Sequence, residues 1–346
     1  MAYTTIDDPT DYFSIVLYTG NAGTQSITGV GFSPSLVWIK SRNDTNSHYL
    51  FDTVRGVHNP LIADHTTAEN ADTDTLTSFD SDGFSIGDNT GINGSSDTEV
   101  VWNWKSGTSF SNDASSTGIG SIDSSGIFSN DAGFSIVSFV GTGSNATVKH
   151  GLNSAPALIF FKDRSATKDW FVYHQSYSPA TGGKLNLDVN PSSDSTYFQN
   201  TATTSSVFSI GSANTVNASS NNMIAYCFAE KKGYSKFGSY VANGNSDNAF
   251  VYTGFKPAFV IIKLTSHSGG GWEIVDNKRD GFNGENHRLY ANEYAVEGSG
   301  NDYDLLSNGF KVRQSGGSQQ SGRTNIYMAF AESPFVNSNG VPNNAR

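Results

Sequence analysis

The sequence is poor in cysteine and in charged side chains, and both shortages exclude classes of protein. Cys227 is the single cysteine among 346 residues, so a disulfide framework is excluded. Because it lies within a predicted strand, we interpret it as a small buried apolar residue. Lysine and arginine number 21 against 32 aspartates and glutamates, which gives a net charge of −11 without a basic stripe. This balance argues against nucleic-acid phosphates and against an anionic membrane surface as partners.

Long apolar runs and catalytic motifs are absent as well. Residues 1–8 are acidic and contain no apolar signal-peptide core, and no stretch is long enough to span a membrane. We therefore expect a protein that is made in a cytoplasm, with no membrane insertion. None of the seven histidines falls at HxxxH or HExxH spacing, and no GxSxG elbow occurs. We predict no enzyme activity, no cofactor and no metal.

Two weaker chemical alternatives stay open at this level. Paired carboxylates for glycoside hydrolysis depend on separation in space, and the cluster that would supply them is Glu273, Asp276, Glu285 and Glu293. Acidic pairs beside glycine in 72–74 and 80–83 are candidates for calcium, although a solvated turn is the favoured interpretation.

What the sequence does contain is typical of an all-β protein. Glycine is abundant at 36 residues, aromatic residues reach 12%, and short apolar runs alternate with polar loops. Residues 288–296 are the best candidate for a short helix.

One apolar pattern occurs three times, as Pro34–Lys40, Pro156–Lys162 and Pro257–Lys263. Each copy is a proline, a small residue, four apolar or aromatic residues and a lysine. A proline can begin a strand because its missing N–H is not needed there, and four apolar residues in a row predict burial on both faces. We interpret the final lysine as structural, with its charge extended to the rim of the sheet.

The neighbours of this pattern recur at nearly constant distances. Each copy lies between a strand that ends in glycine and an aromatic-rich closing strand that ends at Trp104, Phe228 or Phe330. From the proline to that aromatic residue the distance is 70, 72 and 73 residues. A period of about 100 residues is too long for a solenoid or a propeller blade. It predicts an internal repeat that forms three tandem β-sandwich domains of jelly-roll type.

This spacing divides the chain into six parts. They are a polar leader (1–11), β-sandwich repeat 1 (12–105), a Ser/Gly-rich arm or linker (106–132), repeat 2 (133–233), repeat 3 (234–333) and an extended C-terminal tail (334–346). The arm contains Ile119, Ile122, Ile127 and Phe128, which predict that it is ordered and docked on a neighbouring surface. The short joint between repeats 2 and 3 predicts a rigid relation, while repeat 1 is free to sit elsewhere.

Side chains of two sizes alternate along the closing strands. One face carries large residues such as Trp102, Tyr226 and Met328, and the other carries small ones such as Cys227 and Ala329. Alternation sends these two sets to opposite faces of a sheet. We expect the large set to fill the core of each sandwich and the small set to meet a neighbouring domain or loop.

The tryptophans supply the candidate binding residues. Trp38, Trp102 and Trp104 fit a core pattern, whereas Trp170 and Trp272 begin strands after polar loops. With Asp169 and Asp276 beside them, Trp170 and Trp272 are candidates for glycan contact, because an aromatic face can stack on the C–H surface of a sugar. Packing in the core is the favoured alternative for both rings.

Several stretches together carry a resemblance to a known family. They are Trp102–Lys105, the Ser/Gly-rich arm, Ala132–Val137, Gly141–Gly143, Lys149–Leu152, Asp169–His174, Met328–Phe335 and Ser338–Arg346. Over nearly its whole length the chain resembles a domain repeated in virion proteins of tailed phages, particularly marine ones, for which no activity is assigned. The resemblance implies a structural component on the tail or head surface of a phage particle.

Two functional interpretations compete. The first is a virion structural protein, a tail fibre, adaptor or capsid-surface appendage, which we expect to assemble with copies of itself as a trimer and with other virion proteins. The second is a glycan-binding, lectin-like module of a fibre that recognises a host surface glycan. A lectin should leave Trp170 or Trp272 exposed, whereas an assembly protein should pack them and extend its arms to a neighbour.

Overall fold

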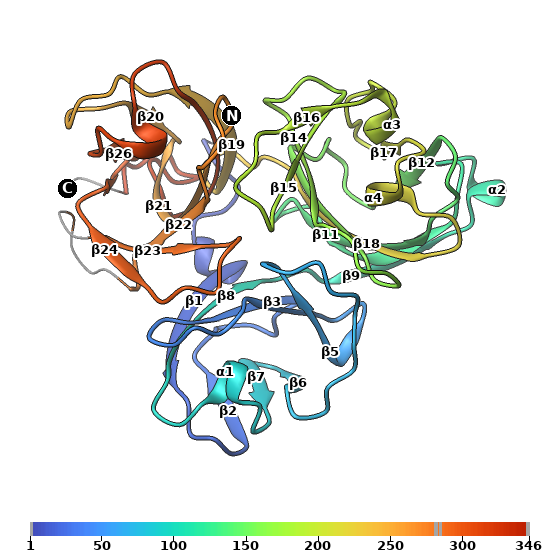
Figure 1. Ribbon diagram of the computed structural model, residues 1–346, viewed down its shortest axis with the longest axis horizontal. Coiled ribbons are helices and arrows are strands. Elements are labelled where there is room, and N and C mark those ends of the chain that lie inside the picture. Colours follow the sequence, from blue (N-terminus) through green and yellow to red (C-terminus); the bar gives the residue numbers. More distant parts are fainter. Residues whose placement is uncertain (1–2, 280–282, 284–285, 344–346) are drawn as a thin grey trace.

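The computed structural model describes residues 3–279, 283 and 286–343. Within these residues the chain is built mainly of antiparallel strands with a few single-turn helices, so the all-β prediction is confirmed. Figure 1 shows three lobes arranged around a common centre. We call the lobes unit 1 (12–105), unit 2 (133–233) and unit 3 (234–333).

Each unit pairs a larger sheet with a smaller one. In unit 1 the elements are β1 (Phe13–Thr19), β2 (Gln25–Thr28), β3 (Leu36–Ser41), β4 (Tyr49–Asp52), β5 (Gly56–Ile62), β6 (Leu76–Asp80), β7 (Gly83–Ile86), α1 (Thr90–Asn93) and β8 (Thr98–Trp104), preceded by a 3-10 turn, η1 (Pro9–Asp11). The larger sheet has the order β1-β8-β3-β4-β5 and the smaller one β2-β7-β6.

Units 2 and 3 have the same plan. Unit 2 contains β11 (Phe134–Val140), β12 (Ala146–Lys149), β13 (Leu158–Asp163), β14 (Phe171–His174), β15 (Thr181–Lys184), β16 (Ser192–Ser193), α3 (Ser195–Phe198), β17 (Val207–Ile210), α4 (Asn214–Asn217) and β18 (Asn222–Phe228). Unit 3 contains β19 (Ser235–Val241), β20 (Phe250–Tyr252), β21 (Phe255–Leu264), β22 (Trp272–Asp276), β23 (Asn286–Tyr290), β24 (Gly298–Gly300), β25 (Tyr303–Leu306), β26 (Gly309–Val312), η2 (Gly317–Gln319) and β27 (Thr324–Pro334).

Five strands of the larger sheet have one order in all three units. The orders β1-β8-β3-β4-β5, β11-β18-β13-β14-β15 and β19-β27-β21-β22-β23 correspond strand by strand. The registers also correspond, because Trp102, Tyr226 and Met328 on the closing strands each face the fifth residue of the proline pattern. We call residues at such matched register positions equivalent. That the units arose by duplication stays a prediction.

Each unit has its own sandwich core between its two sheets. In unit 1, Val37 and Val101 of the larger sheet pack with Ile27 and Phe84 of the smaller one. Units 2 and 3 have corresponding clusters, in which the small closing-strand residues Cys227 and Ala329 lie. The burial predicted for Cys227 is confirmed, since its exposed fraction is 0%.

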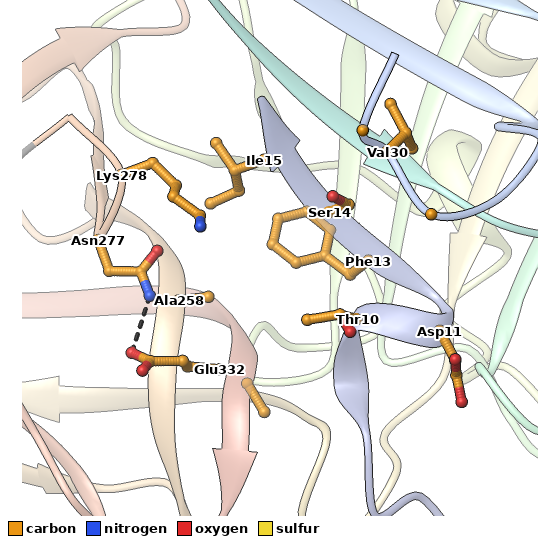
Figure 2. Close-up of a pocket in the computed structure, with 13 residues that line it drawn as sticks. Thr10, Asp11, Phe13, Ser14, Ile15, Val30, Ala258, Asn277, Lys278 and Glu332 are labelled. Carbon is orange, nitrogen blue, oxygen red and sulfur yellow. Dashed lines mark hydrogen bonds between the residues drawn. The ribbon is translucent and has the colours of Figure 1, made fainter. Parts of the chain in front are cut away.

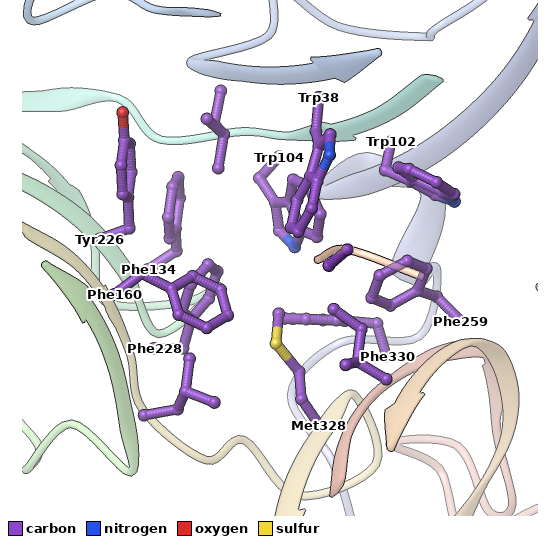
Figure 3. Close-up of a cluster of buried hydrophobic side chains, with 14 of the residues drawn as sticks. Trp38, Trp102, Trp104, Phe134, Phe160, Tyr226, Phe228, Phe259, Met328 and Phe330 are labelled. Atoms are coloured by element: carbon purple, nitrogen blue, oxygen red, sulfur yellow. The ribbon is translucent and has the colours of Figure 1, made fainter. Parts of the chain in front are cut away.

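The large closing-strand residues lie elsewhere, and the predicted assignment of the two faces is wrong. Trp102, Tyr226 and Met328 belong to a fourth cluster that combines side chains from all three units. Figure 3 shows aromatic rings of the three units meeting there, including Trp104, Phe228 and others. Large rings reach the common centre, whereas the small residues let each unit's own smaller sheet approach closely. The expectation that unit 1 sits elsewhere is therefore also wrong.

The segment before unit 2 is ordered. It forms β9 (Thr108–Asn112), α2 (Ala114–Thr117) and β10 (Ser124–Ser129), and these strands extend the unit 2 sheet beyond β11. Ile122 and Phe128 pack against the unit 2 sandwich core. The arm thus docks on the chain's own sheet edge.

Two local predictions are wrong. The helix expected at 288–296 is replaced at its start by strand β23, which pairs with β22 and β24 and so takes its hydrogen bonds from the sheet. The tail expected to be extended instead turns back, with Val336 bridging to Pro342. The Ser338 N–H donates to Asp7 at 2.6 Å, so the tail contacts the N-terminal segment of its own chain.

Candidate functional site

Trp170 and Trp272, the predicted glycan-stacking residues, are buried, with exposed fractions of 0% and 2%. Packing, the favoured interpretation of both rings, is therefore confirmed, and the alternative of exposed rings is wrong: each ring is inserted between two units. Trp170 Nε1 donates to the carbonyl of Ile62 in unit 1 at 2.7 Å. Trp272 Nε1 donates to the carbonyl of Lys184 in unit 2 at 2.8 Å. The two acceptors are equivalent, because Ile62 faces the first residue of β4 and Lys184 faces the first residue of β14, the corresponding strand of unit 2.

Unit 1 has His48 at the position of these tryptophans. The backbone N–H groups of His48, Trp170 and Trp272 each donate to an equivalent Asp or Asn side chain, at 2.9, 3.0 and 2.7 Å. Burial lowers the pKa of His48 well below its usual value, despite the opposing effect of the nearby Tyr290 carbonyl in unit 3. Each unit therefore extends one ring toward the next, and the three contacts close a ring of units.

The carboxylates predicted beside these tryptophans are engaged within the protein. Asp169 accepts a hydrogen bond from Asn186 at 2.9 Å and forms an ion pair with Lys184 at 2.7 Å. Burial opposes its ionisation, but these two partners outweigh burial and lower the pKa of Asp169. Asp276 is 1% exposed and lies at an interface between units. Neither carboxylate is paired with an exposed tryptophan ring.

Asp276 belongs to a chain of charges between units 1 and 3, which we call the 1–3 network. Its Oδ2 atom accepts from Trp102 Nε1 of unit 1 at 3.1 Å and from Arg279 Nε at 2.7 Å. Arg279 also pairs with Glu297 at 3.0 Å, and Glu297 forms a bidentate pair with Arg42 of unit 1. Burial would raise the pKa of Glu297, but the two arginines lower it below its usual value.

Units 1 and 2 share a second chain with the same plan, the 1–2 network. Asp52 Oδ2 accepts from Tyr226 of unit 2 at 2.7 Å and from Arg55 Nε at 2.5 Å. Arg55 also pairs with Glu69 at 2.9 Å, and Glu69 receives two hydrogen bonds from Arg164 of unit 2. Burial alone would lower the pKa of Arg55, but the charge of Asp52 raises it above its usual value.

The interface between units 2 and 3 has neutral residues at the same positions, His174 and Tyr177. His174 Nε2 lies 3.2 Å from the carbonyl of Tyr327 in unit 3, and its Nδ1 accepts from the Ser176 N–H. Burial lowers the pKa of His174 to about 4, so the ring is neutral at pH 7. The adjacent Gln175 donates to the Phe237 carbonyl of unit 3 at 2.7 Å.

The three recurring lysines do not extend to the rim, and that prediction is wrong. Lys40, Lys162 and Lys263 are 0%, 0% and 1% exposed. Their ammonium groups donate to backbone carbonyls in loops or at a strand end, for example from Lys162 to Thr66 at 2.9 Å. Burial lowers the pKa of each to about 8. Their role in fixing loops is structural, although the charge is buried with the stem.

A cavity of about 370 Å³ opens between β1 of unit 1 and unit 3 (Figure 2). Asn277 lines this cavity at the position equivalent to Gln175 of unit 2, and its side chain is one methylene shorter than that of Gln175. Asn277 donates to Glu332 at 2.8 Å rather than to a backbone carbonyl of unit 1. Ile15, the residue equivalent to Phe237, therefore lines the cavity together with Lys278.

The remaining chemical alternatives gain no support from the geometry. Asp72 accepts a hydrogen bond from the Asp74 N–H, and Asp82 accepts one from the Gly31 N–H of another loop. No described group of three or more His, Cys, Asp or Glu side chains could hold a metal. In the glycosidase cluster, buried Glu273 accepts from Tyr303 and Ser318, and Asp276 pairs with Arg279. Glu285 lies outside the described residues. Among the described helices, none is long and apolar enough to cross a membrane.

Fold and interfaces together define a single-chain, three-unit β-sandwich protein closed around a shared aromatic core. A family model described as "Domain of unknown function (DUF7483)" matches residues 8–334, so the chain belongs to that family. A search of curated proteins finds no match.

Sequence reasoning missed the interface networks, although a signal for them was present. Asp52 and Arg55 share a D-x-x-R spacing with Asp276 and Arg279, and in each pair the aspartate is the last residue of an equivalent strand. Unit 2 breaks the spacing with His174 and Tyr177. A polar pair repeated at a strand end in two units predicts a structural role that the units share.

Proposed function

We propose that the protein is a non-enzymatic structural component of a phage particle, a tail fibre or adaptor or a capsid-surface appendage. The observation that carries the proposal is the closed ring of units, in which a single buried core combines side chains from all three. Such a core ties the units into one body, which suits a part that must keep its shape within a larger assembly. That this larger assembly is a phage particle is inferred from the resemblance to virion proteins.

The fate of the candidate residues supports the structural role. Trp170, Trp272 and Asp276 were the best candidates for ligand contact, and all three are used between units. Packed tryptophans were expected of an assembly protein and exposed ones of a lectin. The arm and the tail, however, both contact their own chain, so assembly by arm exchange loses its structural basis.

Self-association remains part of the proposal, with a trimer expected and other virion proteins as further partners. The interface must involve outer surfaces, because the faces first considered for it are buried within the chain. Sedimentation of the full chain would measure the number of copies. A monomer across the accessible concentration range would contradict the trimer without affecting the structural role.

The test of particle location is labelling of intact phage with an antibody raised against the recombinant chain, viewed by electron microscopy. Label at fibre tips or over the head supports the proposal and distinguishes tail from capsid. Protein confined to the lysate, with unlabelled particles, would overturn it. Pre-absorption of the antibody with the recombinant chain is the control for specific labelling.

A further inference from the structure

Unit 3 exposes two aromatic rings on the outer face of its smaller sheet. Phe250 and Tyr252 are 45% and 48% exposed, and Val251 between them is buried in the sandwich core. Alternation along β20 thus puts both rings on the solvent side, about 7 Å apart along the strand. Lys311 of β26 lies opposite Phe250 of the adjacent strand β20. We call Phe250, Tyr252, Lys311 and the nearby Lys236 the unit 3 aromatic face.

The other two units show that the fold does not require these residues. At the positions of Phe250 and Tyr252, unit 1 has Ser26 and Thr28, and unit 2 has Thr147 and Lys149. At the other two positions both units have serine. Lys236 corresponds to Ser14 and Ser135, and Lys311 corresponds to Ser85 and Ser209.

Four changes on one face separate unit 3 from both of its counterparts. Each replaces a side chain that is small and polar in at least one other unit with a large aromatic or cationic one. Nearly half of each ring stays exposed to solvent, and packing within the unit does not account for that exposed apolar surface. A partner that covers the rings does account for them.

The charges around the face are unusual for this acidic chain. Lys236 Nζ lies 5.3 Å from the centre of the Tyr252 ring, and Lys232 Nζ lies 4.3 Å from the centre of the Tyr3 ring. The Tyr3 and Tyr252 hydroxyls are 3.2 Å apart, which brings the two clusters together. Neither lysine forms an ion pair with any described residue.

The other charges close to the face are balanced. Lys311 pairs with Asp247 at 2.7 Å, and Arg313 pairs with Asp304 at 2.5 Å. The two free ammonium groups therefore leave a local positive charge beside exposed rings, in a chain whose net charge is −11. Such a patch attracts an anion with an apolar surface.

We propose that the unit 3 aromatic face binds an acidic oligosaccharide, one that contains uronate residues. The C–H face of a pyranose ring stacks on Tyr252 or Phe250, and a sugar carboxylate pairs with Lys236 or Lys232. Sugar hydroxyls both donate and accept hydrogen bonds, and the Lys311–Asp247 and Arg313–Asp304 pairs offer both kinds of partner. This mixture of groups favours a glycan over an acidic peptide, which offers fewer paired hydroxyls.

This inference does not depend on the location of the protein in a particle. Binding is measured with the isolated chain, so a failure of the labelling experiment leaves it intact, and a failure of binding leaves the structural role intact. The site also differs from the one predicted at Trp170 and Trp272.

The experiment is isothermal titration of the full chain with oligogalacturonate of defined length and with the matching neutral oligogalactose. The test variants install residues of the other units: F250S/Y252T gives the unit 1 pair, and K236S gives the serine of both counterparts. Matched controls are Y294S, which removes an exposed ring elsewhere (57% exposed), and V241T, which installs the equivalent Thr19 of unit 1. Because the side chains at all five positions are at least partly exposed, circular dichroism should show unchanged folding.

We expect oligogalacturonate to bind wild type better than the neutral sugar. F250S/Y252T should weaken binding at least about tenfold, which corresponds to about 1.4 kcal/mol. K236S should weaken it about threefold and reduce its salt dependence, because one charge contact is lost. Y294S and V241T should bind as wild type.

Three outcomes would overturn the proposal. The first is no binding of oligogalacturonate by the folded wild type. The second is equal binding of polyglutamate, which would identify a general polyanion or acidic-peptide site. The third is unchanged binding by F250S/Y252T, or a change of oligomeric state in that variant, which would assign the rings to contacts between copies.

Discussion

The three interfaces between units place equivalent residues at equivalent positions, yet two of them are charged and one is neutral. The 1–2 and 1–3 networks each use a buried Asp–Arg pair that reaches the neighbouring unit through Tyr226 or Trp102. At the 2–3 interface His174 and Tyr177 stand in their place, and His174 contacts a backbone carbonyl. The same backbone arrangement therefore accommodates either an ionic or an uncharged set of interface side chains.

The neighbouring closing strand explains the neutral choice. Tyr226 and Trp102 each offer an N–H or O–H donor to a carboxylate, whereas Met328 at the equivalent position offers none. A buried carboxylate facing Met328 would lose that partner, which is costly for a charge away from water. The ring of His174, as a donor, instead reaches the carbonyl of the adjacent Tyr327. A polar contact from the strand-end residue to the closing strand of the neighbouring unit, and not net charge, is the property that the three interfaces share.

The largest expected effect is loss of a ring between units. W170A and W272A each remove a buried ring and leave a carbonyl without its donor, so each should reduce the free energy of unfolding by about 3–5 kcal/mol. Because one ring lies at a charged interface and the other at the neutral one, similar losses would show that ring packing is independent of the networks. Urea unfolding followed by circular dichroism measures both, and Y294A is the exposed control. A loss below about 1 kcal/mol in either variant would contradict the packed position.

Breaking a network should come next. R55M leaves Asp52 buried without its cation, with an expected loss of about 3–5 kcal/mol in the same assay. R42M, at the partly exposed end of the 1–3 network, should lose only about 1 kcal/mol.

The double variant D52H/R55Y sharpens the comparison, because it installs the residues of the neutral interface in unit 1. A histidine at 52 can donate to the Tyr226 hydroxyl, so the variant should lose less stability than R55M. If it loses more, the neutral arrangement depends on features that only the 2–3 interface has.

The next prediction concerns pH and the neutral interface alone. The pKa of His174 is lowered to about 4, against about 6.5 in an unfolded chain, so between these values the unfolded chain binds more protons. The free energy of unfolding should therefore fall as pH falls from about 6.5 to 4, and this histidine contributes about 3 kcal/mol of the loss. H174N keeps an acceptor for the Ser176 N–H but cannot be protonated. Urea unfolding of both proteins between pH 4 and 7 should give a smaller pH-dependent loss for H174N, and parallel curves would contradict the assignment.

The sequence allowed the strands to be predicted but not the partner of each face. The four apolar residues of the proline pattern lie within β3, β13 and β21 as predicted, because four apolar residues in a row have no exposed face. The prediction that the proline begins the strand is wrong, since β3 and β13 begin two residues after it and β21 begins two residues before it. Alternation on the closing strands also separates large from small residues as predicted. Which set faces the unit's own smaller sheet depends on how three units pack together, and that information is not in the local pattern.

The candidate site was harder to predict for a related reason. A tryptophan after a polar loop has the same local sequence whether it packs in its own unit, packs against the next unit or contacts water, so the sequence of Trp170 and Trp272 does not identify their partners. The aromatic face of unit 3 was readable in principle, since Phe250 and Tyr252 occupy positions where unit 1 has serine and threonine. Finding it required the alignment of β20 with β2, and the strand register supplied that alignment.

The smallest expected effect tests the neutral interface at Tyr177, the residue equivalent to Arg55 and Arg279. Its hydroxyl is buried, and the described residues offer it no hydrogen-bond partner. Y177F removes that unpaired group and keeps the ring, so the free energy of unfolding should stay within about 0.5 kcal/mol or rise by up to about 1 kcal/mol. R279M in the same assay should lose about 3–5 kcal/mol, because it leaves Asp276 without its cation. A loss above about 2 kcal/mol in Y177F would mean that the hydroxyl has a partner, and the 2–3 interface would then depend on this position as strongly as the charged interfaces do.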